Sequence, residues 1–409
     1  MATIAVMGTL DSKGLEHDFV AARIRSMGYQ TLLIDVGTTG QPSIVPDVSS
    51  EEVAAAAGVE LQRMRERRDR GESVLAMAAA APEILLKLYR ERRIQGVISL
   101  GGSSGTAIAS SGMRALPTGF PKLIVSTMAS GNIAPYVGTK DIVMMPAIVD
   151  VAGLNRISRV IFARAAGAIC GMVSAEISAA ETRPLIAASM FGNTTGCINA
   201  AIPLLEQAGY EVLVFHANGT GGRTMESLIE SGMIRGVLDI TTTELADELV
   251  GGVLTAGPDR VSAAARCGIP SVVAPGCLDM VNFGEQGSVP RQFFNRLFYN
   301  HNPQVTLMRT TPEECHRLGT VLAEKVNASV APVTVMIPLQ GISVISAAGG
   351  PFHDPFADSA LFNSLANTLR PGIRIVDVDA TINAPEFAQA CVRELLANIN
   401  ISASRSVVS

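Results

Sequence analysis

The chain has 409 residues, more than one hydrophobic core usually serves, so two domains are expected. Hydrophobic residues make up 48% of it, charged residues 17% and aromatic residues 4%, with no tryptophan and a net charge of -5. This balance excludes a basic nucleic-acid groove and an aromatic stacking platform, and the small and β-branched side chains favour buried parallel strands.

No charged leader with an apolar signal core opens the sequence, and no apolar run reaches the length of a membrane span. The cysteines show neither a CxxC pair nor a histidine at metal-ligand spacing. We therefore expect a cytoplasmic protein without a membrane partner, with reduced and mostly buried thiols. The six cysteines are Cys170, Cys197, Cys267, Cys277, Cys315 and Cys391.

The first βαβ unit is predicted over residues 2–37. An apolar strand at residues 2–7 runs into a Gly8 loop, a helix follows at residues 16–27, and a second strand ends near Asp35. In that loop, Lys13 either pairs with a phosphate or is a solvated first-turn residue. Asp35 either binds a ribose, as acids do at this point of dinucleotide folds, or caps a turn.

The stretch QGVISLGGSSGTAIA, residues 95–109, is the strongest local signal in the chain. A buried strand stops at glycines and feeds a helix, which gathers free backbone N–H groups at the positive end of the helix dipole. Residues 123–132 repeat this strand-to-loop pattern, with hydroxyl-bearing residues and a glycine after a β-branched strand. Two such neighbouring strand ends predict an anion site at the edge of a parallel sheet.

Three polar side chains stand out in the remainder of this half of the chain. A β-like segment at residues 141–150 leads into a helix that starts near residue 154. Asp141, Asp150 and Asn155 lie in apolar surroundings, so each either ties down the backbone or faces the predicted crevice. The polar, alanine-rich residues 174–183 mark the expected boundary, which gives domains 1–180 and 181–409.

The second half repeats landmarks of the first in the same order. Gly28-Tyr29 recurs as Gly209-Tyr210, and QGVI at residues 95–98 recurs as RGVL at residues 235–238. Internal repeats of this kind indicate two related folding units. The predicted fold class is therefore α/β, with two Rossmann-like parallel-sheet subdomains that face a shared cleft.

The loops of the second half supply the candidate catalytic residues. A glycine loop at residues 219–222, followed by Arg223, resembles an anion cradle with a forked cation beside it. His216 ends an apolar strand there and is a candidate general acid/base, or a histidine held by backbone groups. Glu244 stands in the first turn of a predicted helix, where capping is the alternative to catalysis. Cys277 is a weaker candidate nucleophile.

Four long strings of the sequence resemble one protein family: residues 125–157, 214–232, 237–260 and 275–284. They are similar to the amino-terminal ATP-binding domain of the plant tobamovirus-resistance protein family and its bacterial and fungal relatives, over about residues 4–396. This resemblance implies bound ATP with Mg²⁺, two Rossmann-like subdomains and a homodimer. The TIM-barrel domain that follows in the plant protein is not part of this chain, so a separate TIM-barrel partner protein is implied.

The ATP implied by this resemblance is expected at the loops selected above, without a Walker lysine, and no metal ligand is assigned. A small anionic metabolite is the expected substrate, and phosphoryl or nucleotidyl transfer is the expected reaction. The alternatives are a nucleotide-sensing regulatory module and an ATP-independent lyase or hydrolase. The expected catalytic residues are His216, Arg223 and Glu244; the cofactor-binding residues are Gly8, Thr9, Asp11, Lys13, Asp35, Gly101, Gly102, Ser103, Ser104, Gly105, Thr106, Ser126, Thr127, Met128, Ala129, Ser130 and Gly131; and the substrate-binding residues are Asn193, Thr194, Asn218, Gly219, Thr220, Gly221 and Gly222.

Overall fold

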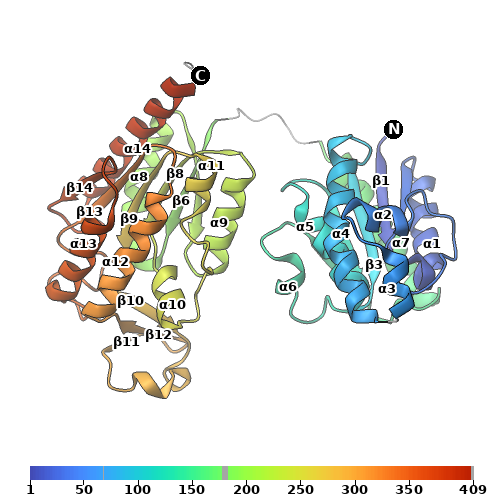
Figure 1. The fold of residues 1–409 in the computed structure, drawn as a ribbon, viewed down its shortest axis with the longest axis horizontal. Coiled ribbons are helices and arrows are strands. Elements are labelled where there is room, and N and C mark those ends of the chain that lie inside the picture. The colour runs from blue at the N-terminus through green and yellow to red at the C-terminus, as the bar shows by residue number, and fades with distance from the viewer. Residues whose placement is uncertain (68, 177–182, 407–409) are drawn as a thin grey trace. The chain divides into compact units, whose positions relative to one another are not determined.

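The computed structural model describes residues 1–67, 69–176 and 183–406. The chain divides into two compact units, Met1–Ala179 and Ala180–Ser409, and each is described by itself (Figure 1). The boundary predicted between residues 180 and 181 lies outside the described residues.

The first unit is built on a five-stranded sheet in which every pairing is parallel. The strand order is β2-β1-β3-β4-β5. The strands are mostly apolar in their central residues, as expected where helices cover both faces of a sheet. The strands are β1 (Thr3–Gly8), β2 (Gln30–Asp35), β3 (Gly96–Gly101), β4 (Lys122–Ser126) and β5 (Val143–Pro146).

The helices of the first unit divide between the two faces of this sheet (Figure 1). Along β3, Val97 packs with the cluster formed by α2, α4 and α5, whereas Ile98 packs with α1 and α7. This is the alternation expected of successive strand residues. The helices are α1 (Leu10–Ser26), α2 (Ser50–Ala56), α3 (Leu61–Arg67), α4 (Arg70–Arg90), α5 (Ser103–Ala115), α6 (Ala134–Val137) and α7 (Arg156–Ser174).

Helix α7 is long and apolar enough to cross a membrane by length and composition, and it is the one such helix in the described part of the chain. Phe162, Ala165 and Ile169 on this helix are buried in the core of the first unit. A core helix of a soluble domain meets the same criterion, so this finding is weak support for a membrane span.

The second unit contains a six-stranded parallel sheet with the order β14-β13-β9-β8-β6-β7. A small antiparallel sheet, β10-β12-β11, is inserted between β9 and β13 and was not predicted from the sequence. The strands are β6 (Leu185–Met190), β7 (Glu211–His216), β8 (Ile234–Thr241), β9 (Ser271–Gly276), β10 (Met280–Phe283), β11 (Phe298–Asn302), β12 (Val305–Arg309), β13 (Val333–Pro338) and β14 (Arg374–Val378).

Helices also cover both faces of the second sheet (Figure 1). One face packs against α8 and α14, and the other against α9 to α13. Three short 3₁₀ turns lie at Gly192–Thr194, Gln286–Ser288 and Arg291–Phe293. The helices are α8 (Thr195–Gln207), α9 (Thr220–Glu230), α10 (Glu244–Val250), α11 (Ala263–Cys267), α12 (Pro312–Asn327), α13 (Pro355–Thr368) and α14 (Pro385–Ser406).

The two units share one topology, which confirms the predicted repeat and the α/β fold class with two parallel sheets. In each, the first strand lies between the second and the third. The landmark glycines correspond as well: Gly28 and Gly209 both follow a helix with φ near +88° and +89°, a conformation that favours glycine. Gly96 and Gly236 pair with Ile4 and Ile186, respectively, at matching places in the two sheets. The shared cleft stays a prediction.

Candidate functional site

A pocket of about 350 Å³ lies in the first unit at the carboxyl ends of β1 and β3. These strands are neighbours, and the chain leaves them toward opposite faces of the sheet, through α1 and α5. Ligands in open parallel sheets bind at such a switch point. The lining residues are Thr9, Asp11, Ser12, Lys13, Thr38, Thr39, Arg70, Val74, Gly102, Ser103, Ser104, Gly105, Ile108 and Asp150.

Helix α5 begins at this pocket without a side-chain cap at its N-cap residue, Gly102. The N–H groups of the first turn have no partner within a helix, so those of Ser103 to Gly105 are available to a ligand. Gly101 permits the tight turn, because a Cβ there would lie 3.0 Å from the N atom of Thr106. The start of α5 thus offers several N–H groups and the positive end of a helix dipole.

The turn after β1 forms the opposite wall. Helix α1 is interrupted at Lys13, whose φ of -134° and ψ of 28° are not helical. The Lys13 ammonium donates a hydrogen bond to the carbonyl oxygen of Val151, in the segment after β5. Glu16 accepts a hydrogen bond from the N–H of Gly153 at 2.5 Å. Both contacts hold this segment, which contains the pocket residue Asp150, against α1.

Asp11 contributes a carboxylate to the pocket. Its Oδ2 atom accepts hydrogen bonds from the N–H and hydroxyl of Thr39, at 2.9 and 2.7 Å, and from the N–H of Gly40 at 3.2 Å. Burial raises the pKa of Asp11, but the hydrogen bonds from Thr39 and Gly40 outweigh it and leave the pKa below 3.8. Asp11 is therefore ionised at neutral pH.

Several predicted cofactor residues support the loops instead of lining the pocket. The hydroxyls of Thr106 and Ser126 lie 2.6 Å apart, and Ser126 also accepts a hydrogen bond from Met128 N–H at 2.9 Å. Both side chains are fully buried. They link α5 to β4. The rest of the predicted β4 loop, formed by Thr127, Met128, Ala129, Ser130 and Gly131, is also outside the pocket lining.

The burial of Asp35 does not fit the predicted ribose contact. Its Oδ1 atom accepts hydrogen bonds from Leu10 N–H at 3.0 Å and Gly37 N–H at 2.8 Å, and the residue is 1% exposed. Burial raises its pKa, and these N–H groups only partly oppose that change. Asp35 ties the loop after β2 to the start of α1, the turn-capping alternative. Gly8 is likewise buried, packed against His17.

The predicted anion cradle of the second unit holds one of the chain's own carboxylates. Glu244 is fully buried, and its Oε1 atom accepts hydrogen bonds from Gly219 N–H at 2.7 Å and Gly222 N–H at 3.1 Å. The N–H of Gly221 donates to the Asn218 side chain at 3.0 Å. These are the N–H groups that an anionic substrate was expected to use. The geometry therefore favours the capping alternative for Glu244 over a catalytic role.

Arg260 is the centre of this buried cluster. Its guanidinium forms two bonds with Asp239, at 2.5 and 2.6 Å, and its Nε atom donates to Glu244 at 2.5 Å. Glu226 completes the cluster at 3.2 Å. Burial lowers the pKa of Arg260, but Asp239, Glu244 and Glu226 together raise it well above its ordinary value.

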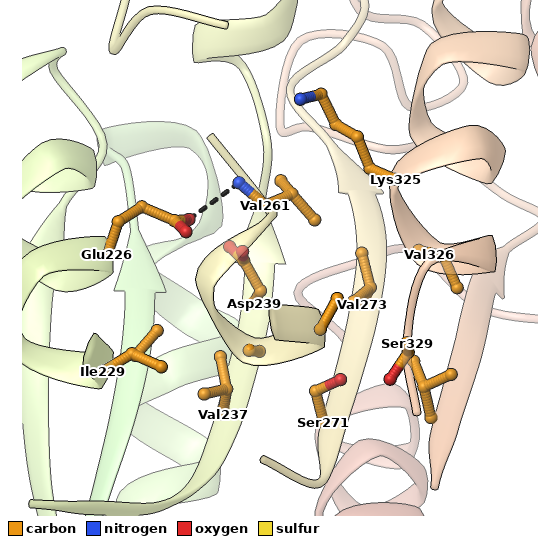
Figure 2. A pocket seen from close by; sticks show the side chains of 13 residues that line it. Glu226, Ile229, Val237, Asp239, Val261, Ser271, Val273, Lys325, Val326 and Ser329 are labelled. Atoms are coloured by element: carbon orange, nitrogen blue, oxygen red, sulfur yellow. Dashed lines mark hydrogen bonds between the residues drawn. The ribbon is translucent and has the colours of Figure 1, made fainter. Parts of the chain in front are cut away.

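Glu226 connects the same cluster to the backbone. Figure 2 shows its carboxylate bonded to the N–H of Val261, at 2.7 Å, with Asp239 nearby on β8. The cavity drawn there has a volume of about 20 Å³ and is lined largely by aliphatic side chains. That space holds about one water molecule. It offers no room for a metabolite.

His216 and Arg223 remain accessible in the second unit. The His216 ring stacks on Phe191, with centroids 5.1 Å apart, and its residue is exposed. Arg223 is also exposed and donates to Thr255 O at 3.2 Å and to the Thr220 hydroxyl at 3.3 Å. Both side chains can contact a ligand from solvent. Their catalytic roles stay predictions.

Asn193 and Thr194, expected to bind substrate, are buried in the turn after β6. The carbonyl oxygen of Asn193 accepts hydrogen bonds from Val344 N–H at 3.3 Å and the Asn383 side chain at 2.9 Å. The Thr194 hydroxyl lies 2.7 Å from that of Thr241. These contacts connect the loops at the carboxyl edge of the second sheet.

The structure argues against a nucleophilic role for Cys277. Cys277 is fully buried, and burial together with nearby Asp279 raises the pKa of its thiol well above the ordinary value. Such a thiol is a poor nucleophile. Within residues 1–67, 69–176 and 183–406, no three His, Cys, Asp or Glu side chains gather as a metal site.

Two important residues, Arg260 and His17, were not predicted from the sequence. A charged residue inside an apolar strand, Asp239 in GVLDI, was the available signal that a buried cationic partner exists. Nothing local in the sequence names Arg260 as that partner, since it lies 21 residues further on. His17 sits in a helix whose pattern gave no separate signal.

Comparison with known proteins assigns both units. Residues 2–178 match the model of the Uncharacterised protein family (UPF0261) N-terminal domain, and residues 183–399 match its C-terminal domain. A UPF0261 protein of Clostridium tetani is 48% identical over 395 residues, which cover 96% of this chain and 98% of that protein. MurG of Acinetobacter baumannii, a solved structure, covers 97% of this chain and 100% of its own at 10% identity, but its TM-score of 0.22 supports no conclusion.

The ToMV resistance protein Tm-1(GCR237) of Solanum lycopersicum is 38% identical over 413 residues, covering 95% of this chain and 55% of the tomato protein. This confirms the resemblance to the tobamovirus-resistance protein family. The chain spans about half of that relative, so the properties of the whole tomato protein do not transfer directly. With both domain models matched, this chain belongs to the UPF0261 family, together with its bacterial members and the homologous region of tomato Tm-1.

Proposed function

We propose that the first unit binds ATP with Mg²⁺ in the pocket after β1 and β3, and that the protein uses ATP to act on a small anionic metabolite. The observation that carries this proposal is the meeting of two glycine-containing loops at one switch point. One loop opens α5 with uncapped N–H groups, and the other brings Lys13 to the same pocket.

The pocket fits a polyphosphate better than a neutral ligand. Backbone N–H groups at Ser103 to Gly105 suit phosphate oxygens, and the dipole of α5 favours negative charge there. Lys13 and Arg70 add two cations to the lining. Val74 and Ile108 supply an apolar wall, against which the nucleoside can pack. The pocket volume of about 350 Å³ is within the range of small-molecule sites.

Asp11 and Asp150 are the residues that would hold Mg²⁺. Asp11 is ionised, and all three of its bonds to the loop after β2 use Oδ2. Mg²⁺ needs only one or two protein carboxylates, because phosphates and water supply its other oxygen ligands. When bound, the ion would neutralise phosphate charge. Asp11 and Asp150 would fix its position.

The metabolite is assigned to the exposed side chains of the second unit. With the N–H groups of Gly219 and Gly222 bound to Glu244, Arg223 and His216 are the accessible groups for a carboxylate or phosphate. Arg223 would contribute charge and a forked donor, and His216 would accept or donate a proton. Phosphoryl or nucleotidyl transfer is the reaction class that uses such positioning and charge stabilisation.

Titration calorimetry of the full chain with ATP and Mg²⁺ tests the binding step. Arg70→Ala should weaken ATP affinity about tenfold, since a charge-assisted contact to phosphate is lost. Arg90→Ala is the matched control, because Arg90 ends the same helix and does not line the pocket. Absence of ATP binding by the wild type would overturn the proposal.

Turnover is tested by incubation with ATP and a library of small carboxylates, followed by detection of ADP, AMP and pyrophosphate. Activity that disappears in Arg223→Ala and His216→Ala supports the enzyme. Tight ATP binding with no turnover for any metabolite supports the nucleotide-sensing module instead. Turnover of a metabolite without ATP would support a lyase or hydrolase.

A further inference from the structure

The pairing of β1 with β3 stops early, beside the pocket. The β1-β2 ladder continues to Gly8 and Asp35, and the β3-β4 ladder continues to Gly101 and Ser126. The β1-β3 ladder, in contrast, ends at Met7 and Ser99, one residue before Gly8 and two residues before Gly101. The pairing between the two strands that carry the phosphate loops therefore stops before either strand ends.

His17 of α1 lies beside this end of the β1-β3 ladder. Its Nε2 atom accepts a hydrogen bond from the N–H of Leu100 at 3.3 Å. Because Nε2 accepts, Nδ1 carries the proton, and it donates to the carbonyl oxygen of Lys13 at 2.7 Å. The ring is fully buried, and burial lowers its pKa, which favours the neutral form with one donor and one acceptor.

The residues around the His17 ring leave space for it. A Cβ atom at Gly8 would overlap the imidazole, so only glycine allows β1 to pass this close. The carbonyl of Lys13 is at the point where the helical conformation of α1 is interrupted. One side chain thus touches the strand of one phosphate loop and the backbone of the other.

In the second unit, a serine hydroxyl instead of an imidazole connects the corresponding strands, β6 and β8. Its β6-β8 ladder ends at Ala188 and Leu238. Beyond that pair, the N–H of Thr241 donates to the hydroxyl of Ser189 at 2.9 Å. A hydroxyl therefore links β8 to β6 in the second unit, where the first unit uses an imidazole that also reaches the backbone of the other loop.

We infer that His17 is a positioning residue: its imidazole joins the end of β3 to the turn at Lys13 and so fixes the loops at Thr9–Lys13 and Gly102–Gly105 around one phosphate group. This inference rests on the proposed ATP site for its functional meaning. Its structural part, the hydrogen bond between Leu100 and His17, can be measured without any nucleotide.

The test compares the full-length wild type with His17→Phe and His17→Gln. Phenylalanine retains a ring but makes neither hydrogen bond, whereas glutamine retains a donor and an acceptor. The ATP dissociation constant should rise at least about tenfold in the Phe variant and by less than about threefold in the Gln variant. Leu100 amide exchange should accelerate at least about tenfold in the Phe variant, with Val125 on β4 unchanged.

The outcomes of this test distinguish a failure of the His17 inference from a failure of the proposed ATP site. A folded Phe variant with wild-type ATP affinity, or with unchanged exchange at Leu100, overturns the inference and leaves the ATP site standing. An equal loss of ATP affinity in both variants assigns the effect to packing and also overturns it. If the wild type binds no ATP, the proposed function fails, and Leu100 exchange still decides whether His17 holds the end of β3. If the Phe variant does not fold, the imidazole ¹⁵N shifts of the wild type decide: a proton on Nε2 instead of Nδ1 overturns the inference.

Discussion

Arg260 and Asp239 form a two-pronged ion pair inside the second unit, with Nη1–Oδ2 and Nη2–Oδ1 distances of 2.5 and 2.6 Å. Arg260 is fully buried, and Asp239 is nearly so. The same guanidinium binds Glu244, which in turn holds the first turn of α9. The residues predicted to bind an anion are therefore tied to a structural cluster of charges.

Arg260→Met should destabilise the second unit by about 3–5 kcal/mol, because removal of one partner leaves buried carboxylates without compensation. Arg266→Met is the control: Arg266 pairs with Glu230 on the surface, where an ion pair contributes less than about 1 kcal/mol. Urea unfolding followed by circular dichroism measures both. Equal stability of the two variants would contradict the structural role of Arg260.

Asp247 should make the second unit less stable as the pH rises toward neutrality. Its carboxylate accepts two hydrogen bonds from Asn282, each of 2.7 Å, but burial raises its pKa from 3.8 to about 7. Between these values the folded chain keeps a proton that the unfolded chain releases. The stability contributed by this group is therefore present at low pH and is lost as the pH rises through the folded pKa.

Unfolding free energies at several pH values, for the wild type and Asp247→Asn, test this relation. From pH 5 to 7, the wild type should lose about 2 kcal/mol relative to the variant, which cannot titrate at this position. The difference between the two proteins removes the contributions of other titrating groups. If the unfolding free energies of the two proteins changed equally with pH, Asp247 would have an ordinary pKa.

Ser126 and Ser104 should differ in their effects on ATP binding. Ser126→Ala should cost about 1 kcal/mol of stability, because its buried hydroxyl bonds to Thr106, and it should leave ATP affinity unchanged. Ser104→Ala should reduce ATP affinity with little effect on stability, since Ser104 lines the pocket. Thermal unfolding and calorimetric titration measure the two properties. If Ser126→Ala reduced ATP affinity and Ser104→Ala did not, the ATP site would lie at the loop after β4 instead.

Much of the fold was predictable from local pattern. Apolar strands that end in glycine, and the recurrence of Gly28 and Gly96 as Gly209 and Gly236, indicated two parallel sheets of the same topology. The antiparallel β10-β12-β11 insertion was not predicted. Its strands have only four or five residues, and β11, FYNHN, is mostly polar, so only the Asn302-Pro303 turn signal pointed to a hairpin there.

The sites were less predictable than the fold, because contacts across the sheets decide them. In the sequence, the loop at Gly219 looks like the best anion site after the loop at Gly101. The difference between them is Glu244, which is 25 residues from Gly219 along the chain and only 2.7 Å from its N–H in the fold. Asp35 was similarly ambiguous, since only the fold shows that its carboxylate is buried against Leu10 and Gly37.

Amide exchange with and without ATP and Mg²⁺, read along the whole chain, tests the central claim most directly. ATP should slow exchange in residues 9–14 and 102–106 of the first unit, because the N–H groups of Ser103 to Gly105 are open to phosphate and both loops contribute residues to the pocket. Gly219, Gly221 and Gly222 should exchange unchanged, because Glu244 and Asn218 already bind their N–H groups. Protection of these three glycines, with no change in residues 9–14 and 102–106, would contradict the account.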